Sequence, residues 1–348
     1  MASGAARLLV LDLQATAARW RLSPEHADVV RHAAPPEWRV HVVSAPTSSD
    51  GDGGSLPSEE ALEAIGDAEV YFGFGISPPL FRAARKLRWV HSGAAGVASL
   101  LFPEMRASSV VVTNSAGIHA VPMAEHVLGG VLYLLRGLDL AVARQRERVW
   151  ARDDFVRLDS PVRELGRCRA LVIGAGGIGG EVAKRLAAFG AYVTGVRRRP
   201  ELGAPHGFAR MTGPGEWRER LPETDLLILT APATSETRRM VTGAELDRLP
   251  VGAIVVNVAR GSLLDQEALA DRIERGALRG AVLDVFEQEP LPPDSRLWAL
   301  SSVLVTPHVS PVTPGGFWPR QLELFLDNWR RYTVGEPLRN VVDKGAGY

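Results

Sequence analysis

Short apolar runs alternate with amphipathic stretches along most of the chain, a pattern that predicts strands separated by helices. In the first third of the chain, buried strands are expected at residues 8–11, 40–43, 70–72 and 89–90. Helical spacing occurs between them, for example at residues 59–65, and the last of these runs leads into a glycine-rich turn at 92–96. Because such alternation is typical of parallel sheets, we expect an N-terminal α/β domain.

Helical spacing of apolar residues then extends from residue 121 to about residue 148, which predicts one long helix that connects two domains. A second alternating block follows, with six apolar runs at residues 170–173, 192–193, 226–229, 253–256, 280–283 and 303–305. Six strands with intervening helices favour a doubly wound, nucleotide-binding sheet. A last amphipathic helix, expected at 321–332, needs a partner for its apolar face, and the N-terminal block is the candidate.

The length of 348 residues exceeds that of one typical core and also favours two domains. Residues 47–57 interrupt the first block with a run rich in serine, glycine and aspartate. This composition predicts an exposed, mobile loop.

Composition limits the classes of partner. Lysine plus arginine equals aspartate plus glutamate at 40 each, so no overall field attracts nucleic acid or an anionic membrane. No apolar stretch approaches the roughly 20 residues of a membrane span. The single cysteine, Cys168, fits a reducing compartment and an inert packing role. We expect a soluble, cytoplasmic protein that binds neither nucleic acid nor membrane, and no metal site is expected.

The most specific local pattern is the loop Gly174-Ala175-Gly176-Gly177-Ile178-Gly179. It follows the first apolar run of the second block and precedes a helical run at 181–189, the order that dinucleotide binding requires. Gly174 permits the tight turn, Gly176 lets the backbone approach phosphate oxygens, and Gly179 permits close packing of helix on strand. Backbone N–H groups and the helix dipole then favour the pyrophosphate. The alternative is a purely structural turn.

The next strand ends in Arg197-Arg198-Arg199 rather than in the carboxylate that binds the ribose hydroxyls of NAD. Guanidinium groups attract the 2′-phosphate of NADP and cannot accept a hydrogen bond from a free 2′-hydroxyl. We therefore expect NADP(H) to be favoured over NAD(H), with Arg197 and Arg198 binding the phosphate. The alternative is a solvated basic turn, which at least one of the three arginines is expected to be.

Later strands of the second block end in residues that suit a dehydrogenase, and the carboxyl ends of strands in an open α/β sheet face the ligand. The fourth run leads into Arg260, with Gly261 allowing the chain to turn, and the sixth leads into His308. Between them the chain leaves the sheet with two candidate carboxylates, Glu287 and Glu289. Each has a plainer alternative: the arginine pairs with a surface acid, the histidine caps a turn, and the glutamates are exposed.

These residues stand in runs that resemble the D-2-hydroxyacid dehydrogenase family. The runs are Asn114-Ser115-Ala116-Gly117, Ala124-Glu125-His126, Val258-Ala259-Arg260-Gly261, Leu283-Asp284-Val285-Phe286 with Glu289-Pro290-Leu291-Pro292, and Thr306-Pro307-His308. The likeness extends from about Leu87 to His308, and the segment order with the Gly347-Tyr348 ending most resembles the bacterial glyoxylate/hydroxypyruvate reductase branch. The family implies a Rossmann cofactor domain, residues 118–314, inserted in a flavodoxin-like substrate domain, residues 1–117 and 315–348; both are doubly wound parallel-sheet domains.

By position, the resemblance implies three catalytic residues. Arg260 would bind the substrate carboxylate and polarise the carbonyl. His308 would protonate the carbonyl oxygen in reduction and remove that proton in oxidation. Glu289, five residues after Asp284 as in the family, would pair with His308 and favour the imidazolium, which leaves Glu287 outside the pattern.

The resemblance also implies binding residues. Backbone N–H groups of Ala95 and Gly96 would hold the substrate carboxylate, although Ala98 stands where the family commonly has an acidic residue. Asp284 would help to hold the nicotinamide end, with a structural hydrogen bond as the alternative. The implied cofactor contacts are Gly174, Gly176, Gly177, Ile178, Gly179, Arg197, Arg198, Ala231, Pro232, Val258, Ala259 and Asp284.

Three further histidines lie near these motifs. His126 follows Glu125 on a helix, a placement that favours a structural role, whereas His91 and His119 would line the cleft without an assigned task.

Together, the residues and the resemblance predict an enzyme that reduces a glyoxylate- or hydroxypyruvate-like 2-keto acid to a D-2-hydroxy acid with NADPH. The family implies a homodimer joined through the cofactor domains. The rival is a dinucleotide-sensing scaffold that resembles the transcriptional corepressors with these same residues; the chain shows no long disordered or basic extension, which argues against it. The sequence leaves open which 2-keto acid is the substrate, how strict the cofactor choice is and in which direction the reaction runs.

Overall fold

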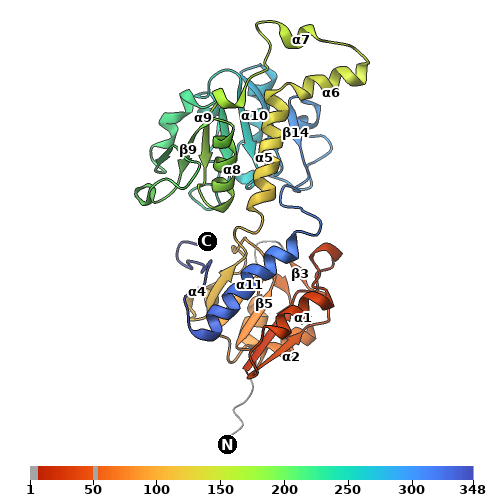
Figure 1. Cartoon of the computed structure of the whole chain (residues 1–348), viewed down its shortest axis with the longest axis vertical. Helices are drawn as coiled ribbons and strands as arrows, with labels where there is room; N and C mark the ends of the chain where they lie inside the picture. Colours follow the sequence, from red (N-terminus) through yellow and green to blue (C-terminus); the bar gives the residue numbers. More distant parts are fainter. Residues whose placement is uncertain (1–6, 50–53, 348) are drawn as a thin grey trace, which may run out of the picture. The chain divides into compact units, whose positions relative to one another are not determined.

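The computed structural model describes residues 7–49 and 54–347, and these form two α/β units (Figure 1). The first unit comprises the described residues up to Ile118 together with those from Thr313 onward, and the second is His119–Val312. The chain therefore leaves the first unit once and returns to it for the last helix. Tyr348 and residues 50–53, which belong to the ending and to the serine-rich run considered above, lie outside the described residues.

A five-stranded parallel sheet forms the centre of the first unit. Its strands are β1 (Arg7–Asp12), β2 (Trp38–Val42), β5 (Val70–Gly73), β6 (Trp89–Ser92) and β7 (Val111–Asn114). They lie in the order β2-β1-β5-β6-β7, which is the flavodoxin-like order. The four strands expected from apolar runs are confirmed, and β7 is a fifth that follows the same pattern.

Helices cover both faces of this sheet. The helices on one face are α1 (Pro24–His32) and α11 (Phe317–Val334), and those on the other are α2 (Glu59–Ile65), α3 (Pro78–Ala83) and α4 (Pro103–Ala107). Successive residues of β1 alternate between the two cores, since Leu8 and Val10 pack under α2 whereas Leu9 and Leu11 pack under α11. Figure 1 shows α11 crossing the sheet. The apolar face of the last helix thus has its expected partner, and the helix begins at Phe317, before the expected start.

The described residues of the serine-rich run are mostly exposed or half-buried, in line with its composition, but they include two short strands and one buried residue. Within it, β3 (Ser48–Ser49) and β4 (Ser55–Leu56) pair as a short antiparallel hairpin. Thr47, at its start, is buried and donates a hydrogen bond to the carboxylate of Asp12, which also accepts one from the Tyr71 hydroxyl at 2.7 Å. Composition alone does not show that one threonine of the run binds a buried carboxylate.

The second unit has a seven-stranded parallel sheet in the order β10-β9-β8-β11-β12-β13-β14. The strands are β8 (Arg169–Ile173), β9 (Tyr192–Val196), β10 (Arg210–Thr212), β11 (Leu226–Leu229), β12 (Ala253–Asn257), β13 (Leu278–Leu283) and β14 (Val303–Val305). This is the Rossmann order with one added strand, and it confirms the expected fold class. All six expected strands are present. The edge strand β10 escaped prediction because its three residues form no apolar run.

Helices again form two layers. One face is covered by α5 (Ala120–Leu135) and α8 (Gly177–Ala188), which lie side by side, and the other by α9 (Gly243–Leu246) and α10 (Gln266–Glu274) (Figure 1). Alternate residues of β8 divide between the layers, with Val172 under α5 and α8 and Leu171 on the opposite face. Strand β8 is therefore buried on both faces of the sheet.

The single helix expected over residues 121–148 is wrong, because the chain bends there by 64° into α5 and α6 (Leu138–Glu147). Gly137 adopts a left-handed backbone, with φ +66°, that ends the first helix. The guanidinium of Arg279 holds the bend by donating to the carbonyl oxygen of Leu134 at 3.0 Å and to the carboxylate of Asp139 at 2.6 Å. The apolar spacing continues across the bend, so the pattern does not reveal it. After α6 the chain forms the short helix α7 (Asp153–Val156).

No single helix in the part of the chain that the structure describes is both long and apolar enough to cross a membrane. Only α5 and α6 together meet that length and composition, and they do so as a bent pair.

Candidate active site

The glycine-rich loop joins β8 to α8, and two of its glycines have a steric reason. A Cβ atom on Gly174, whose φ is +109°, would stand 2.6 Å from the backbone nitrogen of Ala231. A Cβ atom on Gly179 would stand 2.1 Å from the carbonyl oxygen of Gly174. Helix α8 begins at Gly177 rather than at residue 181, so Gly177, Ile178 and Gly179 form its first turn. The loop and the helix thus pack without room for a side chain at Gly174 or Gly179.

Gly176 differs, because its Cβ would meet no described atom within 4 Å. This residue is the N-cap of α8, and N–H groups in the first turn of a helix have no acceptor within it. The loop lies between β8 and β11, where the strand order reverses and open α/β sheets bind ligands. Open space at Gly176, unpaired N–H groups and the positive end of a helix together fit the pyrophosphate of a dinucleotide.

Other predicted cofactor contacts lie at the same edge of the sheet. Ala231 and Pro232 follow β11, the first buried and the second exposed, and Val258 and Ala259 follow β12 and are buried. Their contact with a cofactor stays a prediction.

The basic turn after β9 also lies at this edge. Arg197 is half-buried and donates a hydrogen bond to the carbonyl oxygen of Gly203 at 3.4 Å. Arg198 is exposed and pairs with Glu236 at 3.3 Å, and Arg199 is exposed. Because an exposed ion pair contributes little, Glu236 is a weak competitor for a phosphate at Arg198.

Arg260 follows β12, and the buried side chain of Asn257 fixes its turn. The Asn257 amide accepts a hydrogen bond from the Ala259 nitrogen at 3.0 Å and donates one to the Arg260 carbonyl oxygen at 2.9 Å. The half-buried guanidinium of Arg260 donates to the Ala259 carbonyl oxygen at 2.8 Å. Gly261 was expected to permit a turn, yet its backbone is not left-handed. It is required because a Cβ there would stand 1.9 Å from the carbonyl carbon of Phe286.

His308 lies on the loop after β14, and Asp284 holds that loop. The fully buried carboxylate of Asp284 accepts hydrogen bonds from the Thr306 hydroxyl at 2.6 Å and from the backbone nitrogens of Val309 and Ser310, each at 2.9 Å. Its carbonyl oxygen accepts from the His308 nitrogen at 2.9 Å, and His308 has a left-handed φ of +52°. Both carboxylate oxygens are engaged within the protein, which favours the structural alternative for Asp284 over direct cofactor contact.

The imidazole of His308 and the carboxylate of Glu289 form a close pair, with Nδ1 and Oε2 2.7 Å apart. The other oxygen of Glu289 accepts a hydrogen bond from the Phe286 nitrogen at 3.0 Å, so the carboxylate is held from both sides. Nε2 is the ring nitrogen of His308 that does not face this carboxylate. Glu287 instead pairs with Arg239 at 3.3 Å. The side chains of His308 and Glu289 are 43% and 36% exposed, so ligands can reach the pair.

In the first unit, Ala95 and Gly96 lie on the loop after β6, and hydrogen bonds to neighbouring carbonyl groups set their orientation. The Ser115 nitrogen donates to the Ala94 carbonyl oxygen at 3.1 Å, and the Asn114 side-chain nitrogen donates to the Ala95 carbonyl oxygen at 2.8 Å. In a trans peptide the N–H group points opposite to the carbonyl group. The N–H groups of Ala95 and Gly96 therefore point away from Asn114 and Ser115. Because these two N–H groups are predicted to hold the substrate carboxylate, we call them the carboxylate clamp.

The structure corrects one prediction about the remaining histidines. His91 does not line a cleft: it is fully buried in the first unit, its Nδ1 is 2.7 Å from the Thr113 hydroxyl, and burial lowers its pKa to about 3. His119 is the half-buried N-cap of α5. His126 lies with Nε2 3.2 Å from the Thr306 hydroxyl, which connects α5 to the loop that carries His308.

Sequence reasoning assigned no role to several side chains that position these loops. Asn257 and Asn114 end their strands, and Thr230 directly follows β11 and donates to the Gly174 carbonyl oxygen at 2.8 Å. Ser115 directly follows β7. A polar residue at the carboxyl end of an apolar run is the signal that they share.

Neither a metal site nor an activated cysteine is found among the described residues. Within residues 7–49 and 54–347, no cluster of three or more histidine, cysteine, aspartate or glutamate side chains is placed to hold a metal ion. Cys168 is buried, and burial raises the pKa of its thiol, which is the opposite of activation.

Comparisons with known proteins agree with this geometry. Residues 128–310 match the family described as D-isomer specific 2-hydroxyacid dehydrogenase, NAD binding domain. A glyoxylate/hydroxypyruvate reductase A from Salmonella heidelberg is 32% identical over 281 residues, which cover 78% of this chain and 85% of the relative. A D-3-phosphoglycerate dehydrogenase from Methanocaldococcus jannaschii is 32% identical over 259 residues, 73% of this chain, and the match spans only 48% of that relative.

Solved structures include a similar fold over the full chain. An NADPH-dependent glyoxylate/hydroxypyruvate reductase from Sinorhizobium meliloti, crystallised with NADP and sulfate, superposes with a TM-score of 0.75 at 26% identity. The match covers 98% of this chain and 100% of that structure.

Proposed function

The chain belongs to the D-isomer specific 2-hydroxyacid dehydrogenase family, and from this premise we propose that it reduces a small 2-keto acid to the D-2-hydroxy acid with NADPH. Membership makes it an NAD(P)-dependent oxidoreductase, near the glyoxylate/hydroxypyruvate reductase branch. The observation that supports this chemistry is the 2.7 Å pair between His308 and Glu289, in the unit that also holds the glycine loop and Arg260.

Each residue of the site has its own role in the proposed reduction. The bound nicotinamide supplies the hydride. In the second unit, Arg260 binds the substrate carboxylate and polarises the carbonyl with its positive charge. In the first unit, the carboxylate clamp offers neutral N–H groups to a substrate carboxylate. Nδ1–H of His308 donates to Glu289, which leaves Nε2 to deliver a proton to the carbonyl oxygen. Glu289 orients the imidazole ring through this contact, and the Asp284 carbonyl oxygen keeps the backbone of His308 in place.

Two observations support NADPH as the preferred cofactor. Arg197 and Arg198 follow β9, where the 2′-phosphate lies in this fold, and the three residues that follow the strand, 197–199, are arginines rather than an acidic residue. The Sinorhizobium protein is named NADPH-dependent and contains NADP. The names of that protein and of the Salmonella relative likewise support glyoxylate- or hydroxypyruvate-like acids as substrates.

The proposal extends to the roles of the domains and to assembly. Residues 118–314 bind the dinucleotide, and residues 1–117 with 315–348 bind the substrate carboxylate. The protein forms a homodimer, a proposal supported by exposed apolar side chains on the segment from α6 to just past α7. They are Val149, Trp150, Val156 and Leu158. The cytoplasmic location stays a prediction.

Initial rates with glyoxylate, hydroxypyruvate and larger 2-keto acids, each with NADPH and NADH, test the proposal. We expect turnover of at least one small acid, a higher kcat/KM with NADPH, and a D product on chiral chromatography. Tight NADPH binding without turnover of any 2-keto acid would contradict the enzyme and favour the dinucleotide-sensing scaffold. An L product would contradict the proposed stereochemistry alone.

A further inference from the structure

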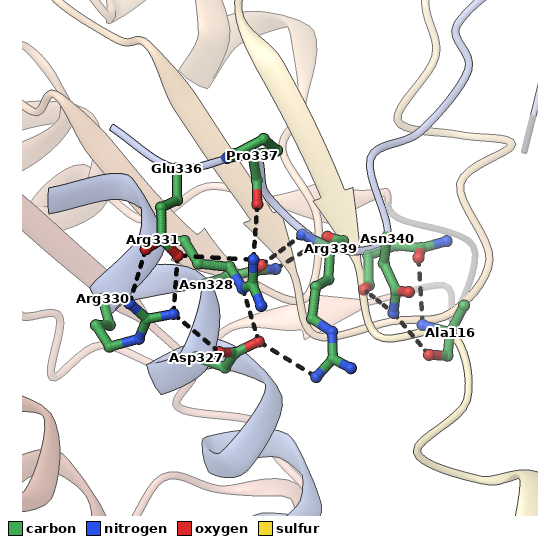
Figure 2. Close-up of polar contacts among 10 residues, drawn as sticks. Ala116, Asp327, Asn328, Arg330, Arg331, Glu336, Pro337, Arg339 and Asn340 are labelled. Atoms are coloured by element: carbon green, nitrogen blue, oxygen red, sulfur yellow. Dashed lines mark hydrogen bonds and ion pairs between the residues drawn. The ribbon is translucent and has the colours of Figure 1, made fainter. Parts of the chain in front are cut away.

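The segment after α11 runs back to the edge of the first unit's sheet, and hydrogen bonds fix it at both ends (Figure 2). At the helix, the side chain of Asn328 is fully buried and accepts from the backbone nitrogen of Arg339 at 2.7 Å and donates to its carbonyl oxygen at 3.0 Å. At the sheet, Val342 donates its N–H to the carbonyl oxygen of Val112 at 2.9 Å. The segment therefore acts as an added partner for the edge strand β7.

Asn340, between these anchors, makes three contacts with the end of β7. Its side-chain nitrogen donates to the carbonyl oxygens of Ala116 at 2.7 Å and Asn114 at 3.3 Å, and its carbonyl oxygen accepts from the Asn114 nitrogen at 3.2 Å (Figure 2). The backbone of Asn340 is left-handed, with φ +54°, a conformation that asparagine tolerates better than most residues. A single residue of the C-terminal segment thus holds the backbone of Asn114 on both sides.

Asn114 carries this constraint to the substrate loop. Its side-chain nitrogen donates to the Ala95 carbonyl oxygen at 2.8 Å, and its side-chain oxygen accepts from the Ala116 nitrogen at 3.2 Å. The orientation of the Ala95 carbonyl group decides where the N–H of Gly96 points, because the two belong to one planar peptide. Asn340, Asn114 and Ala95 therefore form a continuous series of hydrogen bonds that ends at the clamp.

We propose that Asn340 is a positioning residue for substrate binding, which acts through Asn114 to aim the carboxylate clamp at Ala95 and Gly96. The inference rests on the proposed function, in which the clamp binds the substrate carboxylate. Asn340 touches no reacting atom, so its effect falls on substrate affinity rather than on proton or hydride transfer. Since every 2-keto acid presents the same carboxylate, the effect is equal for acids with different side chains.

Two substitutions of Asn340 test this role, and a nearby one serves as control. Asn340→Gly removes the amide while glycine adopts the left-handed backbone readily, so this variant is expected to fold. Asn340→Asp keeps the shape but replaces two N–H donors by a carboxylate that faces two carbonyl oxygens. Glu336→Gln, in the same segment, removes the ion pairs of Glu336 with Arg330 and Arg331, which lie on α11 and not on β7.

We expect both Asn340 variants to raise KM about tenfold, by the same factor for glyoxylate and for larger 2-keto acids, which corresponds to about 1.4 kcal/mol of binding. Their kcat and their Kd for NADPH stay within about twofold of the parent. The lost interaction binds the substrate equally well before and during the reaction, so its loss affects KM alone. Glu336→Gln leaves all of these constants unchanged. In hydrogen–deuterium exchange, the peptide that covers residues 92–97 exchanges faster in Asn340→Gly and not in Glu336→Gln.

Unchanged KM and unchanged exchange at residues 92–97 would overturn the inference. A lower kcat, a higher KM, weaker NADPH binding and a lower melting temperature, all together, would also overturn it. Such a result indicates a general loss of structure. A parent protein that turns over no 2-keto acid contradicts the proposed function and, with it, this inference. Turnover by the parent with an unaltered Asn340→Gly contradicts the role of Asn340 alone.

Discussion

Single side chains of the second unit are held in position by neighbours that take no part in the reaction. Asp284 fixes the loop of His308, and Asn257 fixes the turn of Arg260, each through a fully buried side chain. A buried polar group is costly unless its hydrogen bonds are satisfied, and those of Asp284 are directed at the loop that carries His308. The geometry at Nε2 of His308 is therefore a property of the scaffold, which makes a substitution at His308 informative about chemistry rather than about folding.

Replacing His308 by glutamine is expected to lower kcat for 2-keto acid reduction by about 10²-fold or more, because the proton donor is lost. NADPH affinity should change little, since the hydrogen bonds of His308 join it to Glu289 and Asp284 rather than to the glycine loop. Steady-state rates and the quenching of protein fluorescence by NADPH measure the two effects. A variant that retains more than about a tenth of the activity would remove His308 from the role of acid.

The burial of His91 predicts how the free energy of unfolding depends on pH. Burial lowers its pKa from the ordinary 6.5 to about 3, so the folded protein keeps the ring neutral while the unfolded chain binds a proton below pH 6.5. The stability contributed by the neutral ring is thus complete above pH 6.5 and is lost as the pH falls toward 3, by about 1.4 kcal/mol per pH unit.

His91→Gln removes this titration, and its free energy of unfolding should depend less on pH between about 6 and 4 than that of the parent. Urea unfolding at a series of pH values measures the slopes. Equal slopes for the two proteins would show that His91 does not bind a proton on unfolding in this range.

At the scale of elements, the glycine loop contains two kinds of glycine, one with no room for a side chain and one beside open space. Gly179→Ala places a methyl group against the Gly174 carbonyl oxygen, so we expect it to weaken both the fold and cofactor binding. Gly176→Ala meets no described atom within 4 Å, so it should fold with an unchanged melting temperature. Its methyl group would instead occupy the space for the phosphate and weaken NADPH at least about tenfold. Thermal unfolding with NADPH titration compares the two; unaltered NADPH affinity in Gly176→Ala would place the pyrophosphate elsewhere.

The turn after β9 tests the choice of cofactor. Replacing Arg197 and Arg198 together by alanine removes two cations from the end of a strand where a 2′-phosphate would lie. We expect the Kd of NADPH to rise by about tenfold or more and that of NADH to change little, because only NADPH carries the phosphate. An equal rise in Kd for both cofactors would show that neither arginine binds the 2′-phosphate.

Elements and site differ in how far the sequence predicts them. The buried strands of both sheets other than β7 were predicted because each is a short apolar run, and the glycine loop because its spacing follows from steric demands. The bend at Gly137 was not, since the apolar spacing continues through it. The strand pair β3–β4 was not either, since its serine-rich strands form no apolar run. For the site, Arg260, Glu289 and His308 stand in recognisable motifs, whereas the anchors Asn257 and Asn114 act through long-range hydrogen bonds that no local pattern records.

At the scale of the whole molecule, the segment from α6 to just past α7 presents apolar side chains that the chain does not cover. Trp150 is 93% exposed and Leu158 fully exposed, and several large apolar residues exposed along one surface segment are typical of an interface. The segment is anchored rather than loose at its start, because the ion pair of Asp139 with Arg279 is buried and spans 2.6 Å. This surface is where we expect the second copy of the chain to bind.

Substituting Trp150 and Leu158 together by glutamate places two charges on this surface, and we expect a dimeric parent to become monomeric. Burying two unpaired carboxylates in an interface is costly, while their exposure on a monomer is not, so the variant should still fold. Val251→Glu is the matched control, because Val251 is also exposed on the second unit but lies just before β12, outside the α6–α7 segment. Light scattering after size-exclusion chromatography gives the mass of each protein. A parent that is monomeric, or a double variant that remains dimeric, would exclude this segment as the interface.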